Sequence, residues 1–244
     1  MMNSVDPNSL ERIVPDELQS DETTGLETLQ LHIDRYRFAK DNLIPGSVLD
    51  IACGVGYGTA LLSNSPLVTN AIGVDISSPA IQYATQRYAQ PRVNFVRSDA
   101  LKFQPAYHFE NIVSLETIEH VEDPRALFAH LVSLLAPGGR LIGSVPVTPS
   151  VDANTHHKSN FSIRSFRHLG EAFSLKFLSS HGQVQPYSPL RIALRQETRA
   201  SNLRRYLALF YIQHPSHFFL RLCSTLRDGF NNKYITVVWE KPSM

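Results

Sequence analysis

The stretch SVLDIACGVGYGT, residues Ser47–Thr59, decides the fold. It opens with the apolar pair Val48-Leu49, reaches an acid at Asp50, and then turns through three glycines before a helical pattern begins: Gly54, Gly56 and Gly58. A buried strand that leads through a glycine turn into a helix is typical of doubly wound α/β sheets, because glycine lets backbone N–H groups approach a ligand closely. The sequence therefore predicts a small-molecule site at this turn.

The spacing of the glycines distinguishes two kinds of ligand. A pyrophosphate fingerprint, G-x-G-x-x-G, starting at Gly54 would need glycine at position 59, where this chain has Thr59. The chain instead reads G-x-G-x-G, and Asp50 four residues ahead disfavours a phosphate and favours an ammonium group. The motif DIACGVGYG resembles the first motif of the class I S-adenosylmethionine-dependent methyltransferases (EC 2.1.1).

The second strand, Asn70–Asp75, also ends in an acid. Asp75 lies 21 positions after Gly54 (75 − 54), a spacing at which a carboxylate can accept hydrogen bonds from both hydroxyls of a ribose. The alternative role, capping the next helix, is already filled by Ser77 or Ser78 ahead of a proline. Asp75 is therefore predicted to be a ligand residue.

Two further strands end in polar residues. Val93–Arg97 is followed by Asp99, which resembles the family's third motif, where the carboxylate binds the adenine amino group; a turn aspartate is the alternative. Glu110–Leu115 is followed by Glu116, which could meet the methionine end of the cofactor or the substrate. The resemblance implies S-adenosyl-L-methionine as cofactor, S-adenosyl-L-homocysteine as product, no metal, and this cofactor-binding set: Asp50, Ala52, Gly54, Gly56, Gly58, Asp75, Ile76, Asp99, Ala100 and Glu116.

Five alternations of strand and helix account for residues 47–146. The fourth helix begins at Asp123-Pro124 and ends at Pro137-Gly138-Gly139, and Arg140–Pro146 is the fifth strand. A sixth strand is expected near Leu175–Ser180, and Tyr234–Lys241 as an antiparallel last strand. We therefore expect an α/β fold: a Rossmann-like, seven-stranded, mostly parallel sheet with helices on both faces, plus a helical insert before the last strand.

The 244 residues fit one domain. Residues 1–25 are polar and predicted to be a flexible N-terminal arm; residues 26–244 form a single methyltransferase domain with a helical insert or lid at about 185–232. The first helix runs from Leu26 to Pro45-Gly46. In the family this helix covers the cofactor, which would turn His32, Arg35 and Tyr36 towards the site; otherwise it simply packs on the sheet with these groups in water.

The insert is where the chain departs from the family pattern, because about fifty residues replace a hairpin. A lid over the acceptor and a helical appendix that packs on the core or on a second subunit are equally supported, and membrane contact is a third alternative. Its arginines and aromatic residues are Arg191, Arg195, Arg199, Arg204, Arg205, Tyr206, Phe210, Tyr211, Phe218 and Phe219.

Methyl transfer is an in-line displacement, so the enzyme mainly positions two reactants, and a hydroxyl acceptor also needs a base. His120 follows the fourth strand in the segment Glu119-His120-Val121, which is similar to one in ubiquinone-pathway, sugar and natural-product methyltransferases, where a histidine orients or deprotonates the acceptor. A histidine that only caps the next helix is the alternative. His156 and His157, after the fifth strand, are the other candidates for the base.

Composition and motifs argue against several other classes of function. A formal net charge of +1 argues against a nucleic-acid partner, and the segment Ser114-Leu115-Glu116-Thr117 replaces the asparagine-proline-proline-aromatic motif of amino-methylating nucleic-acid enzymes. Cys53 and Cys223 show neither metal nor disulfide spacing, and a metal set of Asp152, His156 and His157 lacks a second acidic pair. No signal peptide or membrane-spanning run is visible, so a cytoplasmic location is expected.

The sequence thus predicts a transferase that moves a methyl group from S-adenosylmethionine to a small-molecule acceptor. The expected reaction is O-methylation of a sugar, a phenol or another product of secondary metabolism, with a histidine as general base. Two alternatives are an RNA or protein methyltransferase that uses the basic insert, and a non-catalytic cofactor-binding protein.

Overall fold

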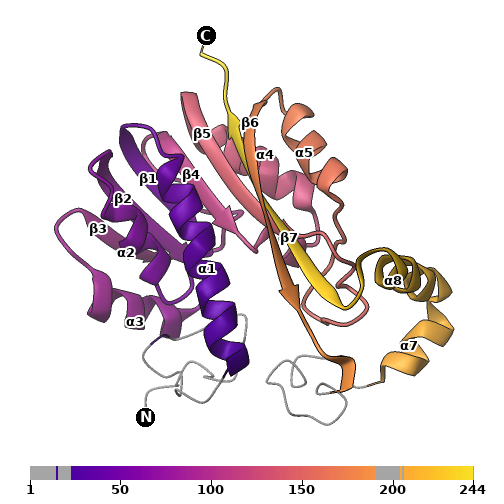
Figure 1. Cartoon of the computed structure of the whole chain (residues 1–244). Coiled ribbons are helices and arrows are strands. Elements are labelled where there is room, and N and C mark those ends of the chain that lie inside the picture. The colour runs from indigo at the N-terminus through magenta and orange to yellow at the C-terminus, as the bar shows by residue number, and fades with distance from the viewer. Residues whose placement is uncertain (1–14, 16–22, 191–203, 205, 244) are drawn as a thin grey trace.

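The computed structural model describes residues 15, 23–190, 204 and 206–243. Its core is one seven-stranded sheet between two layers of helices (Figure 1). In spatial order the strands are β3 (Val93–Arg97), β2 (Val68–Asp75), β1 (Gly46–Ile51), β4 (Phe109–Leu115), β5 (Leu135–Pro146), β7 (Asn231–Glu240) and β6 (Lys176–Pro186). The first five strands pair in parallel, and β7 is antiparallel to both β5 and β6. The predicted fold class is confirmed.

Side chains alternate between the two faces of the sheet, so each face has its own core. Val48 packs with residues of α1 (Thr23–Asp41) and α2 (Tyr57–Ser63), and α3 (Ser78–Tyr88) packs beside α2 on this face. Its neighbour Leu49 packs on the other face with α4 (Pro124–Leu134) and α5 (Ile163–Glu171). Trp239 of β7 is completely buried in this second core.

Two strands, β5 and β6, are five residues longer than the sequence indicated. Strand β5 begins at Leu135, because this residue pairs with Phe109 across a register shift, and the stretch Pro137-Gly138-Gly139 lies inside the strand after α4 has ended at Leu134. Strand β6 continues to Pro186 because it pairs with β7 as far as Asn231. In both cases the partner strand, and not the local pattern, sets the boundary.

The first helix, α1, begins at Thr23, three residues before the predicted start, and most of the proposed N-terminal arm lies outside the described residues. Ala39 and Leu43 anchor α1 in the first core. Hydrogen bonds also join it to the far edge of the sheet: Arg35 Nε donates to Gln183 Oε1 at 2.6 Å, and Gln183 Nε2 donates to the Leu31 carbonyl at 3.0 Å. The helix therefore crosses above the carboxyl ends of the central strands.

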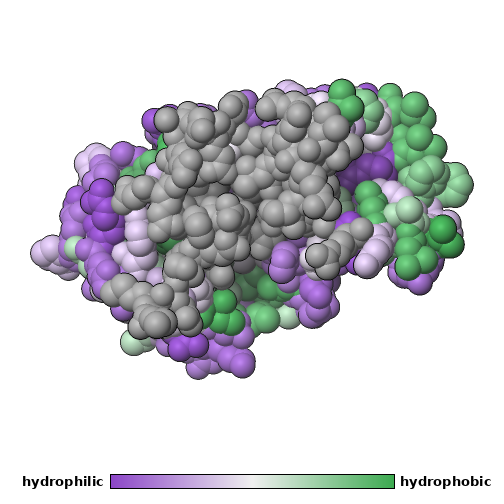
Figure 2. Space-filling model, turned by 90° about the horizontal axis from the view of Figure 1, so that it is seen from below, coloured by the Kyte–Doolittle hydropathy of each residue, from purple (hydrophilic) through white to green (hydrophobic). Residues whose placement is uncertain are grey.

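The insert between β6 and β7 contains α7 (Leu207–Gln213) and α8 (Pro215–Asp228). Apolar side chains gather on the outside of these two helices, at the end of the molecule shown in green in Figure 2; the most exposed are Ile212, Phe219 and Leu226, at 78%, 60% and 79%. Arg191, Arg195, Arg199 and Arg205 lie outside the described residues. Within the described part of the chain, no helix is both long and apolar enough to cross a membrane.

Glycine is needed at the three positions of the turn for different physical reasons. At Gly54 (φ 56°) an added Cβ would meet nothing within 4 Å, so the space above this residue is open. At Gly56 (φ 87°) it would overlap Ala84 and Phe95, and at Gly58 it would overlap the ring of Tyr36. Gly54 thus faces the site, whereas Gly56 and Gly58 allow helices to pack closely.

Replacing Gly58 by alanine tests this packing. Alanine normally favours a helix by about 1 kcal/mol, but here its methyl group would collide with Tyr36, and overpacking of this kind costs about 1–3 kcal/mol. We expect Gly58→Ala to lower the free energy of unfolding measured in urea. Gly182→Ala is the control, because the nearest atom to its added Cβ is 4.0 Å away and little change is expected. Equal stability of the two variants would contradict the packing argument.

Candidate active site

Two cavities lie at the carboxyl ends of the strands. The smaller has a volume of about 80 Å³ and lies against the glycine turn, where Ala52, Gly54 and Tyr57 line it. The larger has a volume of about 540 Å³ and extends under the insert. His32, Arg35 and Glu116 line both cavities, so the two are neighbours with a common wall.

Strained backbone marks the centre of this region. Ala52 (φ 58°) and Glu116 (φ 49°) directly follow β1 and β4, and both line the smaller cavity. Left-handed backbone at non-glycine residues is sparsely populated and clusters at functional sites. The side chain of Glu116 is held by Ser144, whose hydroxyl donates to Oε1 at 2.7 Å. The strand order reverses between β1 and β4, and this is where open α/β sheets bind ligands.

Asp50 lies completely buried beneath the turn and lines neither cavity. Its carboxylate accepts hydrogen bonds from Thr59 Oγ1 at 2.6 Å and from the Tyr36 hydroxyl at 3.3 Å. Burial raises the pKa of Asp50 to about 7, although the hydrogen bonds from Thr59 and Tyr36 act in the opposite direction. Because a raised pKa favours the protonated native state, the contribution of Asp50 to stability is lost as the pH rises through about 7.

Helix α1 supplies one wall of both cavities. His32 Nδ1 lies 3.0 Å from the Tyr57 hydroxyl, and burial together with the charge of Arg35 lowers the pKa of His32 to about 3. Arg35 is 2% exposed, lies 3.8 Å from Glu116, and stacks over the ring of Tyr234 at 4.3 Å. The alternative that α1 leaves these polar groups in water is therefore wrong.

The other predicted cofactor residues continue along the same edge, over β2 and β3. Asp75 is 5% exposed and accepts hydrogen bonds from the backbone of Gly54 at 3.0 Å and of Ser77 at 2.8 Å. Beside it, Ile76 is 60% exposed. Asp99 accepts a hydrogen bond from the Leu101 backbone at 2.9 Å, as a turn aspartate does. Ala100 is half-buried next to Asp99.

This edge suits a long ligand with a polar head and an aromatic end. The predicted residues follow the strand order from β4 to β3: Glu116, Ala52, Gly54, Asp75, Ile76 and Asp99. The open space above Gly54 leaves room for a ligand against the backbone. Arg35, Glu116 and Asp75 offer partners for a carboxylate, an ammonium group and a pair of hydroxyls, and Ile76 presents an exposed apolar surface. The residues fit S-adenosylmethionine.

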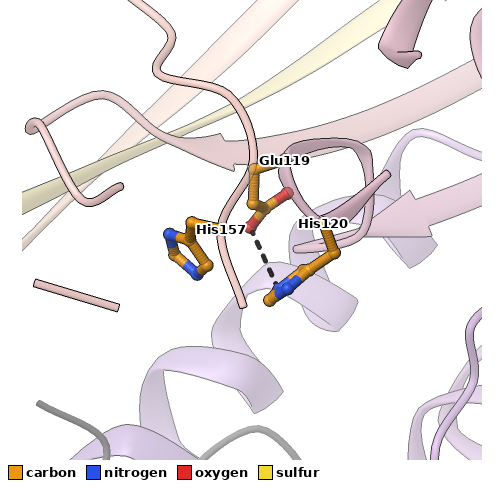
Figure 3. Close-up of side chains that lie close together, drawn as sticks. All are labelled: Glu119, His120 and His157. Carbon is orange, nitrogen blue, oxygen red and sulfur yellow. Dashed lines mark ion pairs between the residues drawn. The ribbon is translucent and has the colours of Figure 1, made fainter. Parts of the chain in front are cut away.

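Of the three histidines predicted to act as the base, two line the larger cavity and one does not. His120, which ends the short helix η2 (Ile118–His120), and His157 both line it, and their rings meet edge to face at 4.6 Å. Glu119 lines it too, with its carboxylate 3.9 Å from His120 Nε2 (Figure 3). Burial and the charges of His120 and His156 lower the pKa of His157 to about 3, so it is a weak base at neutral pH. His156 is exposed and lines neither cavity.

The insert closes one side of the larger cavity with Leu207, Tyr211, Arg221 and Thr225. Buried Asp152 holds it there, because its carboxylate accepts from the Tyr211 hydroxyl at 2.6 Å and from Arg221 at 2.8 Å. Burial works against ionisation, but the hydrogen bonds and charge of Arg221 lower the pKa of Asp152. This carboxylate belongs to an ion pair, which argues against the metal set of Asp152, His156 and His157.

Several lining residues were missed by sequence reasoning: Tyr57, Gln185, Tyr187, Arg221 and Tyr234. Arg221 lies within a run of apolar residues on α8, and only its pairing with Asp152, 69 positions away, reveals it. Tyr57 lies between two of the glycines and is not among the site residues predicted from the sequence. A usable signal existed only for Glu119, because it stands next to His120.

Comparison with known proteins gives consistent matches. The family model described as a methyltransferase domain matches residues 29–196. An uncharacterized methyltransferase of Mycobacterium bovis is 32% identical over 133 residues, 54% of this chain and 66% of that protein. Phosphoethanolamine N-methyltransferase 1 of Arabidopsis thaliana is 33% identical over 144 residues, 56% of this chain but 28% of that protein. The chain thus spans less than two thirds of either relative.

A solved structure gives the same fold. The N-methyltransferase NodS of Bradyrhizobium japonicum, in complex with S-adenosyl-l-homocysteine, superposes with a TM-score of 0.57 at 17% identity. The match covers 93% of this chain and 96% of that chain.

The ion pair between Asp152 and Arg221 yields a test of how the insert is held. We expect Asp152→Asn to loosen α7 and α8, because it leaves a buried guanidinium without its counter-charge, a loss of about 3–5 kcal/mol. Amide hydrogen exchange across residues 207–228 should become faster. Asp228→Asn is the control, because Asp228 pairs with Arg227 and Lys233 near the surface; equal acceleration in both variants would show that Asp152 has no special part.

Proposed function

The chain belongs to the S-adenosylmethionine-dependent methyltransferases, and on this premise we propose that it methylates a hydroxyl of a small molecule bound in the larger cavity. The observation that carries the proposal is the position of His120, which lines that cavity beside the wall shared with the cofactor edge. A phenol, a sugar or another compact secondary metabolite suits a volume of about 540 Å³.

The chain's own residues would hold the cofactor along the strand edge. Asp75 would accept hydrogen bonds from the ribose hydroxyls, Asp99 would accept one from the adenine amino group, and Ile76 would contact the adenine ring. Arg35 and Glu116, 3.8 Å apart, would receive the carboxylate and the ammonium of the methionine end. Bound there, S-adenosylmethionine supplies an electrophilic methyl group on sulfur.

The acceptor would be activated by a residue that lines the larger cavity. We propose that His120 takes the hydroxyl proton, since His157 is too weak a base with a pKa of about 3 and His156 is exposed outside the cavity. Its other nitrogen, Nδ1, lies 3.3 Å from the His156 carbonyl, which keeps the ring oriented. The alternative role of His120, a cap for the next helix, is filled by Asp123, which accepts hydrogen bonds from the backbone of Arg125 and Ala126.

The insert would act as a lid that excludes water from the reacting groups. Leu207 and Tyr211 already wall the cavity, which supports this role. Phe218 and Phe219 instead stay exposed at 43% and 60%, so the same helices also carry an apolar outer surface, as the homodimer alternative requires.

An amine acceptor is the second candidate, because the matched relative from Arabidopsis thaliana and the superposed NodS are both N-methyltransferases by name. The two candidates differ in the atom that carries the new methyl group. Turnover with a labelled methyl donor against paired phenols, sugars and amines, followed by NMR of the product, separates them. The RNA alternative rests on the arginines of residues 191–205. Arg191, Arg195, Arg199 and Arg205 lie outside the described residues, and Arg204 donates hydrogen bonds to the carbonyls of Val151 and Asp152.

The role of Asp75 is tested by calorimetry of S-adenosylhomocysteine binding. We expect Asp75→Ala to weaken binding by at least about tenfold, because each buried polar group left unpaired costs about 1–3 kcal/mol. Asp123→Ala is a matched control: it also removes a carboxylate that accepts from two backbone N–H groups, at 2.9 and 3.0 Å, but Asp123 lines neither cavity. Unchanged affinity in folded Asp75→Ala would remove Asp75 from the cofactor site.

The role of His120 is tested by turnover. We expect His120→Ala to lower kcat by about a hundredfold or more, as for a lost general base, while the affinity for S-adenosylhomocysteine hardly changes. The control is His130→Ala, whose histidine bonds the Phe103 carbonyl at 2.9 Å on α4, outside both cavities. Full activity in His120→Ala would sink the proposal.

A further inference from the structure

Glu119, His120 and His157 form a cluster with the composition of a metal centre. One ligand atom from each lies within 4.8 Å of those of the other two. Figure 3 shows the carboxylate of Glu119 pointing towards the two imidazoles. Glu119 and His120 come from the short helix after β4, whereas His157 comes from the loop after β5. The sheet topology brings these two segments together, since β4 and β5 are paired neighbours.

Hydrogen bonds orient both imidazoles towards this cluster. His120 Nδ1 lies 3.3 Å from the carbonyl oxygen of His156, and His157 Nδ1 lies 2.6 Å from Ser150 Oγ. Histidines that bind metals usually place their second ring nitrogen on a partner of this kind, which fixes the tautomer and the ring plane. Nε2 of each ring is then the nitrogen that a cation would use.

The spacing also suits a bridging ion better than a direct contact. His120 Nε2 lies 3.9 Å from Glu119 Oε1, beyond hydrogen-bond range. Zinc binds nitrogen and oxygen ligands at about 2.0–2.2 Å, so a cation between the two atoms requires only a small inward movement. Glu119 is completely buried, so a cation bound by its carboxylate would be shielded from bulk water on that side.

We propose that Glu119, His120 and His157 bind one divalent ion of the first transition row. Two imidazoles and one carboxylate suit Zn²⁺, Mn²⁺ or Co²⁺, whereas Mg²⁺ and Ca²⁺ prefer oxygen ligands. Three protein ligands leave coordination positions open, and all three residues line the larger cavity, so these positions face the proposed acceptor site. This site uses His157 but neither Asp152 nor His156, and it revises the expectation that no metal is needed.

The chemical meaning of the site rests on the proposed function, although the binding itself does not. The hydroxyl oxygen of an acceptor would occupy an open position on the ion, which lowers the pKa of the hydroxyl so that its proton passes to water. With the ion bound, His120 is a ligand. In the metal-free chain His120 takes the proton itself.

Cobalt provides a direct probe that needs neither cofactor nor acceptor. The full chain, carrying no histidine tag and stripped with a chelator, is titrated with Co²⁺ while its visible absorption is recorded, and Zn²⁺ is then added as a competitor. We expect one Co²⁺ per chain, displaced by Zn²⁺. Glu119→Gln and His157→Gln should each weaken binding by more than about tenfold. His156→Gln should bind as the parent does, because this neighbouring side chain lies outside the cluster.

Circular dichroism establishes that each variant is folded, and His157→Gln decides the matter if Glu119→Gln does not fold. Absence of a saturable Co²⁺ signal, or equal loss of binding in His156→Gln, overturns the metal site. Turnover and S-adenosylhomocysteine binding in the presence of chelator are measured separately. A chain that methylates its acceptor but binds no Co²⁺ would refute this inference and leave the proposed function standing. A chain that binds Co²⁺ at these residues but methylates no hydroxyl acceptor would support the metal site and refute the proposed function.

Discussion

The buried carboxylate of Asp50 joins three elements on which the rest of the site depends. It lies one residue before the end of β1, accepts hydrogen bonds from Thr59 on α2 and from Tyr36 on α1, and so fixes the glycine turn between β1 and α2. The ring of Tyr36 fits only because residue 58 is glycine. The acid that the sequence suggested as a partner for an ammonium group is thus a structural tie, which positions Gly54 and the inner face of α1 for the ligand.

The proposed cofactor edge was largely predictable, because its residues are local to strand ends. Parallel strands buried on both faces appear in the sequence as short apolar runs. An acid such as Asp75 at the end of such a run can therefore be recognised from the sequence alone. The sequence predicts only part of the wall that α1 forms. It indicates Arg35 as a candidate, but the position of this side chain depends on Gln183, 148 positions away. The second half of β6 carried no alternating pattern, and its pairing with β7 alone sets its length.

The two cavities are formed by different parts of the fold. Strand ends and the glycine turn form the smaller cavity, whereas the larger one also takes residues from β6, β7 and the insert. His32, Arg35 and Glu116 line both cavities and are themselves held by contacts to Tyr57, Gln183 and Ser144. Residues held in this way where two cavities adjoin can keep two reactants in a constant relation while the acceptor side varies in shape.

The loop between β5 and α5 both anchors the insert and orients His157. Asp152 and the carbonyl of Pro149 hold Arg221 of α8, while Ser150, between them in the chain, holds the ring of His157. Arg204 adds hydrogen bonds to the carbonyls of Val151 and Asp152. A movement of α8 away from the sheet would pull on the same few residues that fix this imidazole. Entry of an acceptor and the placement of His157 would then be coupled movements, so that an open molecule would keep the strand edge for the methyl donor intact while one wall of the acceptor cavity is displaced.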